Sequence, residues 1–187
     1  TVPPIILAMP APQRFRHAAI VGKPQAQGVR ELLEEVARFL VQQGLDVSLE
    51  RGTAQATGIT AYDVLDAAQL GKQCDVTVVV GGDGTRLGIA RELARFDMPL
   101  IGINQGRLGF ITDIPVDRFR EALAPMVRGE HEEEHRAMLD ASVWRGDACI
   151  FTGVALKDVV VSRSATAGMV ELRVDVGDEF VANMRAD

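Results

Sequence analysis

The chain of 187 residues is long enough for one domain of ordinary size or two small ones, and its 47% hydrophobic and 25% charged residues are typical of a globular protein. Its formal net charge of −6 argues against a general nucleic-acid-binding protein, which carries a basic face. No apolar run reaches membrane-spanning length, and the N-terminal stretch lacks the basic flank of a signal peptide. We therefore expect a cytoplasmic protein with no nucleic-acid or membrane partner, in which Cys74 and Cys149 are free thiols.

From Ala18 to about Arg128 the sequence alternates between two kinds of segment. Short apolar runs, typical of strands, cover residues 17–22, 45–50, 75–80 and 99–103. Apolar residues at helical spacing cover residues 29–43, 85–96 and 116–128, the last helix having Pro115 near its first turn, and a short helix is expected within residues 59–73. Because strands and helices alternate, we predict a doubly wound parallel sheet.

After about His135 the pattern changes to strands alone. Strand-like runs cover residues 136–144, 148–162, 169–176 and 179–185, with turn sequences between them and no helical periodicity. We therefore predict an α/β fold in which residues 1–134 form a doubly wound parallel-sheet domain that binds nucleotide. Residues 135–187 would form the start of an antiparallel β domain that is incomplete at its C-terminus.

The stretch DVTVVVGGDGTRLG, residues 75–88, is the most informative. Its apolar run suits a parallel strand covered on both faces, and the run leads into Gly81, Gly82, Asp83, Gly84 and Thr85 just before a helix. Ligands of open α/β sheets bind beyond the carboxyl ends of the strands, where glycines let a ligand approach the backbone. Since helix N-termini favour anions, the sequence predicts a phosphate-binding turn.

Asp83 is unusual in such a turn because a carboxylate repels phosphate. It suits the site if it hydrogen-bonds an alcohol beside the phosphate and accepts the proton of that alcohol during attack on phosphorus. The alternative is a tight strand-to-helix turn in which Asp83 only caps the helix. The stretch is neither a dinucleotide-binding G-x-G-x-x-G motif nor a P-loop, which ends in Gly-Lys-Ser/Thr.

The GGDGT motif resembles that of a superfamily of small-molecule kinases that includes NAD kinases, diacylglycerol-type lipid kinases and 6-phosphofructokinases. Three further stretches are similar to segments of NAD kinases: PLIGINQGRLGFITD at residues 99–113, ALKDVVVSR at 155–163 and MVELRVDV to FVANMRAD at 169–187. The resemblance covers residues 18–187, and on these motifs the chain resembles the bacterial NAD kinase family.

This resemblance implies roles for particular residues. Asp83 would be the base toward the adenosine 2′-hydroxyl of NAD, with Gly84 beside it and with Gly81, Gly82 and Thr85 forming the phosphate turn. Further NAD or nucleotide contacts fall on Lys157, Asp158, Gly168, Arg185 and Asp187. The resemblance also implies ATP as the phosphoryl donor, a divalent cation such as Mg²⁺ without an assigned metal-binding residue, NAD and ATP as partners, and a homodimer or homotetramer.

Two residues depart from the family pattern. Lys157 stands where the family has asparagine, and an ammonium group donates hydrogen bonds but cannot accept them. Arg86 stands where an apolar residue, often methionine, is usual, and it either points to phosphate or occupies an exposed helix position. A threonine- and serine-rich loop that should follow Asp187 is absent, so we expect the chain to be a fragment.

We interpret the sequence as that of an NAD kinase, which transfers the γ-phosphoryl group of ATP to the 2′-hydroxyl of the adenosine ribose of NAD to make NADP. Two alternatives stay open: a nucleotide-binding fragment or variant without turnover, and a lipid kinase of the same superfamily. The stretch from His131 to His135 fits the zinc-peptidase pattern H-E-x-x-H, but its acidic composition and the strand that follows favour a solvated connector.

Overall fold

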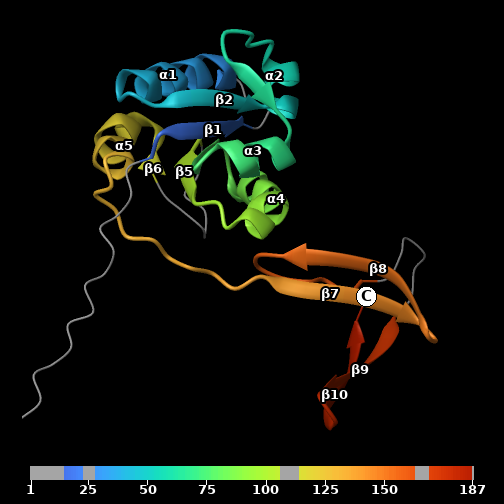
Figure 1. Ribbon diagram of the computed structural model, residues 1–187. Helices are drawn as coiled ribbons and strands as arrows, with labels where there is room; N and C mark the ends of the chain where they lie inside the picture. Colours follow the sequence, from blue (N-terminus) through green and yellow to red (C-terminus); the bar gives the residue numbers. More distant parts are fainter. Residues whose placement is uncertain (1–14, 23–27, 106–113, 163–168, 187) are drawn as a thin grey trace, which may run out of the picture. The chain divides into compact units, whose positions relative to one another are not determined.

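A computed structural model of the chain describes residues 15–22, 28–105, 114–162 and 169–186. The chain divides into two compact units, Thr1–Met138 and Leu139–Asp187. The first unit holds the α/β sheet and its covering helices, and the second holds antiparallel hairpins (Figure 1).

The first unit is built on a six-stranded parallel sheet in the order β3-β2-β1-β4-β5-β6. Its strands are β1 (His17–Gly22), β2 (Asp46–Glu50), β3 (Asp63–Leu65), β4 (Val76–Val80), β5 (Leu100–Asn104) and β6 (Ile114–Pro115). The chain builds outward from β1 to β3 and then returns to add β4, β5 and β6 on the other side of β1. This reversal between β1 and β4 is the topological switch point of a doubly wound sheet, so the predicted fold class is confirmed.

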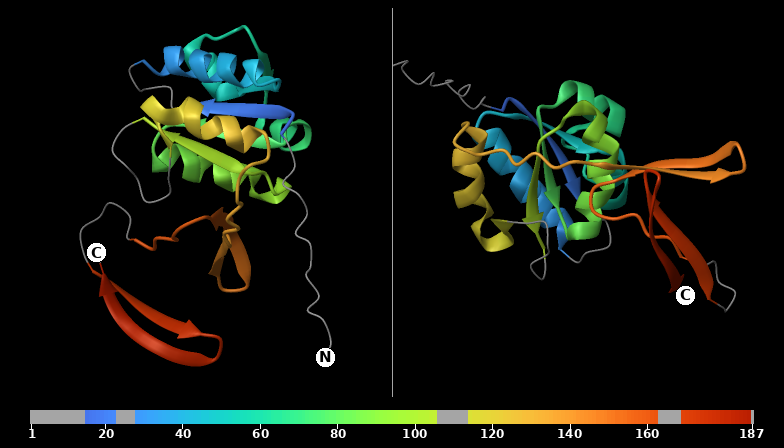
Figure 2. Two further views of the ribbon diagram at one scale, coloured as in Figure 1. Left: turned by 90° about the vertical axis from the view of Figure 1, so that its left-hand side faces the viewer. Right: turned by 90° about the horizontal axis from the view of Figure 1, so that it is seen from below.

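Helices cover both faces of this sheet (Figure 2). They are α1 (Val29–Gln42), α2 (Arg51–Thr57), α3 (Ala67–Gln73), α4 (Asp83–Leu93) and α5 (Phe119–Val127), with 3₁₀ turns at Ala94–Phe96 and Val116–Arg118. The apolar side chains of α1 and α5 belong to one core cluster, and those of α3 and α4 belong to a second. The sheet therefore has two buried faces, which explains why its central strands β1 and β4 are mostly apolar, with Thr77 of β4 as a buried polar exception.

The central strand β1 shows how the sequence divides between these two clusters. Ala18 and Ile20 join the cluster beneath α1 and α5, whereas Ala19 and Val21 join the cluster beneath α3 and α4. Successive strand side chains point to opposite faces, so a strand with two covered faces needs an apolar residue at every position. All four side chains are at most 6% exposed.

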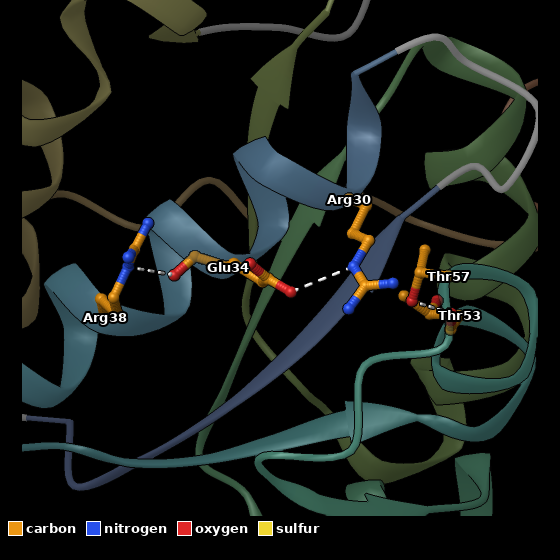
Figure 3. Close-up of polar contacts among 5 residues, drawn as sticks. All are labelled: Arg30, Glu34, Arg38, Thr53 and Thr57. Carbon is orange, nitrogen blue, oxygen red and sulfur yellow. Dashed lines mark hydrogen bonds and ion pairs between the residues drawn. The ribbon is translucent and has the colours of Figure 1, made fainter.

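The outer face of α1 is polar, in contrast to its buried face (Figure 3). Arg30 Nε donates to Glu34 Oε1 at 3.1 Å, and Arg38 Nε donates to the backbone oxygen of Glu34 at 3.2 Å. An exposed i,i+4 ion pair such as Arg30–Glu34 contributes only about 0.3–0.5 kcal/mol, so α1 is held mainly by its buried face. In α2, the hydroxyl of Thr57 donates to the backbone oxygen of Thr53 at 2.7 Å.

The expected helix within residues 59–73 is wrong in its first half, where the structure has strand β3. Asp66 ends this strand segment and caps α3: its carboxylate accepts the Gln69 N–H, and the Gln69 side-chain oxygen accepts the Asp66 N–H, each at 2.9 Å. The residues before Asp66 pair with β2 instead of entering the helix. Pro115 ends β6 and is the N-cap of the 3₁₀ turn Val116–Arg118, which leads into α5 at Phe119, so helical backbone begins directly after Pro115 as expected.

The second unit contains two antiparallel strand pairs. They are β7 (Leu139–Arg145) with β8 (Ala148–Ala155), and β9 (Val170–Val176) with β10 (Glu179–Ala186). The turns contain Gly146 and Gly177 at φ of 59° and 60°, a left-handed conformation that favours glycine in tight hairpins. The strand expected through Ser162 ends instead at Ala155, since residues 156–162 have no ladder partner among the described residues.

The buried thiol of Cys74 is expected to make the first unit less stable as the pH rises into the alkaline range. Burial raises the pKa of Cys74 to about 12, and the charge of Asp75 acts in the same direction. An unfolded thiol loses its proton near pH 8.5, whereas the folded one keeps it, so the contribution is complete below that pH and is lost as pH rises toward 12. We expect about 2 kcal/mol of stability to be lost between pH 8 and pH 10.

This loss is measured by urea unfolding at the two pH values. Cys74→Ala should flatten the pH dependence, because the residue responsible is gone. Cys149→Ala is the matched control, since Cys149 is exposed. An unchanged slope in the Cys74→Ala protein would contradict the assignment.

Candidate functional site

The glycine motif lies at the switch point of the sheet. Gly81 follows β4 directly, Gly82 occupies the N-cap of α4, and Asp83 is the first residue of that helix. Gly22, the last residue of β1, pairs with Val80 at the end of β4. The turn therefore borders the carboxyl ends of the two strands between which the order reverses, where open α/β sheets bind their ligands.

Position 81 requires glycine because the side chain of Thr85 packs against it. Its N–H donates to the backbone oxygen of Ile103 in β5 at 3.0 Å, which joins the turn to the neighbouring strand. The Thr85 N–H donates to the backbone oxygen of Gly82 at 3.1 Å and closes the first helical turn. A Cβ atom on Gly81 would lie 2.8 Å from Thr85 Oγ1 and 3.1 Å from Thr85 Cβ, so a larger residue would push Thr85 away.

Gly82 and Gly84 are glycines for a different reason. Both are exposed, and a Cβ atom built on either would meet no described atom within 4 Å. Gly82 has a φ of −92°, and Gly84 lies within α4, so neither backbone conformation demands glycine. The room beside these two residues can admit a ligand, and the helix N-terminus that they open favours an anion.

Asp83 does not hold the N-cap position that the simpler interpretation gave it. The N-cap residue is Gly82, and it makes no side-chain capping bond. Asp83 is partly buried and lies in the first turn of α4, where a carboxylate interacts favourably with the helix dipole. The structure thus places one carboxylate beside the open glycines.

Arg86 resolves an alternative that the sequence left open. Its side chain is 4% exposed, so the exposed helix position is wrong. It lies over Gly102 of β5, where a Cβ atom would come within 2.7 Å of Arg86 Nε, and its Nη2 donates to the backbone oxygen of Gly81 at 3.5 Å. Burial lowers the pKa of Arg86, and the charge of Asp83 acts in the opposite direction. In the sequence, the glycine at position 102 within the predicted strand 99–103 is the one feature that could have indicated a large side chain packed against that strand.

The remaining predicted contacts belong to the second unit. Lys157 and Asp158 are both exposed, with Lys157 Nζ 3.8 Å from Asp158 Oδ2. Arg185 on β10 donates through Nε to Glu171 Oε1 of β9 at 2.9 Å, across a directly paired strand position. Predicted contacts Gly168 and Asp187 lie outside the described residues. The structure thus brings the turn residues together in one unit and pairs Lys157 with Asp158 in the other.

The zinc-peptidase pattern has no structural support. Residues 130–138 form neither helix nor strand, and the ring of His131 stacks on Phe15 with centroids 5.0 Å apart. His131 Nδ1 also lies 2.9 Å from the backbone oxygen of Met126. Within residues 15–22, 28–105, 114–162 and 169–186, no three or more His, Cys, Asp or Glu side chains gather as a metal site would require. The helices of these same ranges are all too short or too polar to span a membrane.

The fold and the turn together define a doubly wound α/β protein with a candidate phosphate site at its switch point. The sequence profile of the ATP-NAD kinase N-terminal domain matches residues 18–131, from β1 through the glycine turn to the segment that follows α5. This match covers more than half of the chain. The chain therefore belongs to the NAD kinase family.

Relatives of known name agree with this assignment. The NAD kinase of Methylibium petroleiphilum is 64% identical over 178 residues, which cover 93% of this chain and 59% of that protein. The NAD kinase of Polaromonas naphthalenivorans is 59% identical over 174 residues, which cover 93% of this chain and 60% of that protein. The chain thus spans less than two thirds of the length of these relatives.

Solved structures share the fold at lower sequence identity. Yeast NADH kinase complexed with NADH matches with a TM-score of 0.81 at 18% identity, covering 94% of this chain and 56% of that chain. An NAD kinase from Archaeoglobus fulgidus in complex with ATP matches with a TM-score of 0.63 at 24% identity, covering 91% of this chain and 58% of that chain.

The open room beside Gly84 gives a direct test of the turn as a ligand site. Gly84→Ala should leave the fold intact or stabilise it by up to about 1 kcal/mol, because alanine favours helix. The added methyl group should nevertheless weaken Mg-ATP binding by filling that room. Calorimetric titration with Mg-ATP and thermal unfolding measure the two effects.

Gly88→Ala is the matched control for this substitution. Gly88 lies one turn further along α4, and a Cβ atom there also meets no described atom within 4 Å. It should give the same gain in helix stability and unchanged Mg-ATP binding. Equal Mg-ATP affinity in the Gly84→Ala and Gly88→Ala proteins would show that no ligand uses the room beside Gly84.

Proposed function

We propose that this chain carries the phosphate turn and the catalytic base of an NAD kinase, which transfers the γ-phosphoryl group of ATP to the adenosine 2′-hydroxyl of NAD and makes NADP. The observation that carries the proposal is an open glycine turn at the switch point with Asp83 beside it, in a chain of the NAD kinase family. Relatives at 64% and 59% identity that are named NAD kinase support it.

In this proposal Asp83 acts on the acceptor hydroxyl. The 2′-hydroxyl donates its hydrogen bond to the Asp83 carboxylate, and its oxygen then bonds to the γ-phosphorus as the bond to the β-phosphate oxygen breaks. The proton passes to Asp83, and ADP leaves. Phosphoryl transfer depends chiefly on positioning and on charge stabilisation, so moving Asp83 by about 1 Å would cost about 10²-fold in rate.

The glycine turn would receive the phosphates of ATP. Gly82 and Gly84 leave room at the start of α4, and the helix dipole favours the negative charge there. Mg²⁺ is usually held by one or two carboxylates together with substrate phosphates, and the described residues contain no larger cluster of metal ligands. They therefore fit a cation that arrives on the nucleotide and neutralises the triphosphate charge, with Asp83 as the carboxylate of the turn.

We assign the NAD contacts of the second unit to the residues that the resemblance implies. Asp158 and Lys157 would bind the nucleotide together, Lys157 only as a donor because it is an ammonium group. Glu171 holds Arg185 across the β9–β10 pair and would orient it for the same purpose. Gly168 and Asp187 keep their proposed roles. A cytoplasmic homodimer or homotetramer stays a prediction from the resemblance.

A nucleotide-binding module without turnover is the second candidate. Lys157 favours it, because lysine in place of asparagine removes a hydrogen-bond acceptor from the predicted nucleotide contact. NAD binding without formation of NADP would distinguish this module from a kinase. The lipid-kinase alternative has no support, since the family match is to NAD kinases.

The test of the proposed function is NADP formation from NAD and Mg-ATP, measured with a chain extended to the length of its relatives. Asp83→Asn should lower NADP formation by about 10²-fold or more, because the amide cannot accept the proton. The affinity for NAD should stay within a few-fold of the wild-type value. A fully active Asp83→Asn enzyme would remove Asp83 from the role of base.

Asp97→Asn is the control for the loss of one carboxylate. Asp97 is exposed beyond the end of α4 and has a φ of 52°, a conformation that asparagine adopts readily. The Asp97→Asn enzyme should therefore form NADP at the wild-type rate. If neither the wild type nor the controls form NADP while NAD still binds, the module without turnover is the better description.

A further inference from the structure

Gly22, the last residue of β1, extends beyond the point where β1 pairs with β2. On the β4 side the ladder reaches Gly22, which lies opposite Val80. On the β2 side the ladder ends earlier, with Ile20 opposite Leu49. Gly22 is nevertheless buried, and a buried backbone N–H without a hydrogen-bond partner is costly. The end of β1 therefore needs an acceptor that the β2 ladder does not supply.

The side chain of Thr53, in the first turn of α2, supplies this acceptor. Thr53 Oγ1 accepts the N–H of Gly22 at 3.0 Å and lies 3.3 Å from the backbone oxygen of the same residue. The hydroxyl group has one proton, and its nearer acceptor is Glu50 Oε2 at 2.9 Å. With that proton directed to Glu50, Thr53 Oγ1 presents its lone pairs to the Gly22 N–H. Thr53 is 1% exposed, so water does not compete for these bonds.

The position of Gly22 matters because of its neighbours at the switch point. From the α1 layer, Leu33 packs so closely that a Cβ atom on Gly22 would lie 2.8 Å from Leu33 Cδ1. Across the ladder, Val80 directly precedes Gly81, the first residue of the glycine turn. Gly22 therefore sets the β1 side of the switch point, where open α/β sheets bind their ligands.

We propose that Thr53 is a positioning residue of the candidate site: its hydroxyl group fixes the end of β1 beside β4, so that the backbone next to the glycine turn is already in place when the phosphates of Mg-ATP bind. The part of this inference that concerns Mg-ATP rests on the proposed function. Thr53 acts through the backbone of Gly22 and touches no ligand. If the end of β1 opened locally, fewer molecules would be competent to bind, and the apparent affinity would fall by that fraction.

Calorimetric titration of this chain with Mg-ATP measures the effect. Thr53→Val keeps the shape of the side chain but leaves the Gly22 N–H without its acceptor, so it should weaken Mg-ATP binding by about fivefold or more. Thr53→Ser keeps the hydroxyl group and should bind within about twofold of the wild type. Wild-type affinity in the Thr53→Val protein would overturn the proposal, as would a Thr53→Ser protein that binds as weakly as Thr53→Val.

Thr57→Val is the matched control for a loss of stability in α2. Thr57 is also buried, and its hydroxyl group donates to the backbone oxygen of Thr53 instead of contacting Gly22 (Figure 3). Each valine variant removes one buried hydroxyl group from the same short helix and keeps the side-chain volume. Thr57→Val should therefore bind Mg-ATP within about twofold of the wild type. Equal losses of affinity in the two valine variants would show that Thr53 acts only through α2 and would overturn the proposal.

Amide hydrogen exchange without nucleotide tests the bond to Gly22 independently of the proposed function. In the Thr53→Val protein the Gly22 amide should exchange about tenfold faster than in the wild type, whereas Thr57→Val should change its rate by less than about twofold. If the wild-type chain bound no Mg-ATP, the proposed function would be at fault, and these exchange rates would decide whether Thr53 positions Gly22. An unchanged Gly22 rate in the Thr53→Val protein would overturn that role.

Discussion

The parallel pairing of β1 with β4 is the constraint on which the candidate site depends. It places Gly22 next to Val80, so the carboxyl ends of the two strands between which the sheet order reverses lie side by side. Both strands can pair in this way because the side chains of their central part are buried under the two helix layers, and all of them except Thr77 are apolar. The glycine turn is open at this point because the sheet order reverses there.

Each residue of the glycine turn is suited to its position for a different physical reason. Gly81 is small because Thr85 packs against it, whereas Gly82 and Gly84 leave room that no described atom fills. The carboxylate of Asp83 supplies the chemistry that we propose, and the side chain of Arg86 is buried against β5. Gly102 of β5 belongs to the same arrangement because only glycine leaves space for the guanidinium group of Arg86. Strand β5, whose sequence is that of an ordinary buried strand, therefore also helps to position the side chain of Arg86 next to the turn.

The helices and strands that could be predicted from the sequence are those with a clear periodic pattern of apolar side chains. Strands β1, β2, β4 and β5 and helix α1 carry a clear apolar pattern, and the structure places all of them. The short elements α2, β3 and β6 were missed because backbone pairing and caps define them. Helix α2, for example, begins where the Glu50 carboxylate accepts the N–H groups of Gly52 and Thr53 at 2.6 and 2.7 Å, a local contact without periodicity.

At the candidate site, the GGDGT motif predicted the glycine turn, but it did not predict which residues surround Asp83 and Arg86. The burial of Arg86 depends on β5, which follows α4 in the chain, and no spacing along α4 reveals it. Lys157 and Asp158 were predicted as nucleotide contacts, and in the structure Lys157 Nζ lies 3.8 Å from Asp158 Oδ2. Their proposed role in binding NAD stays a prediction, because it involves the second unit, which sequence pattern alone does not relate to the turn.

The central claim is that Mg-ATP binds at the glycine turn of the first unit. The most direct measurement is the change in backbone amide chemical shifts of the ¹⁵N-labelled chain on titration with Mg-ATP. The account predicts the largest changes at Gly82, Gly84 and Thr85, with little change in α1 and α5, which cover the sheet away from the turn. Saturable shifts confined to residues outside the turn, with Gly82 and Gly84 unmoved, would contradict it.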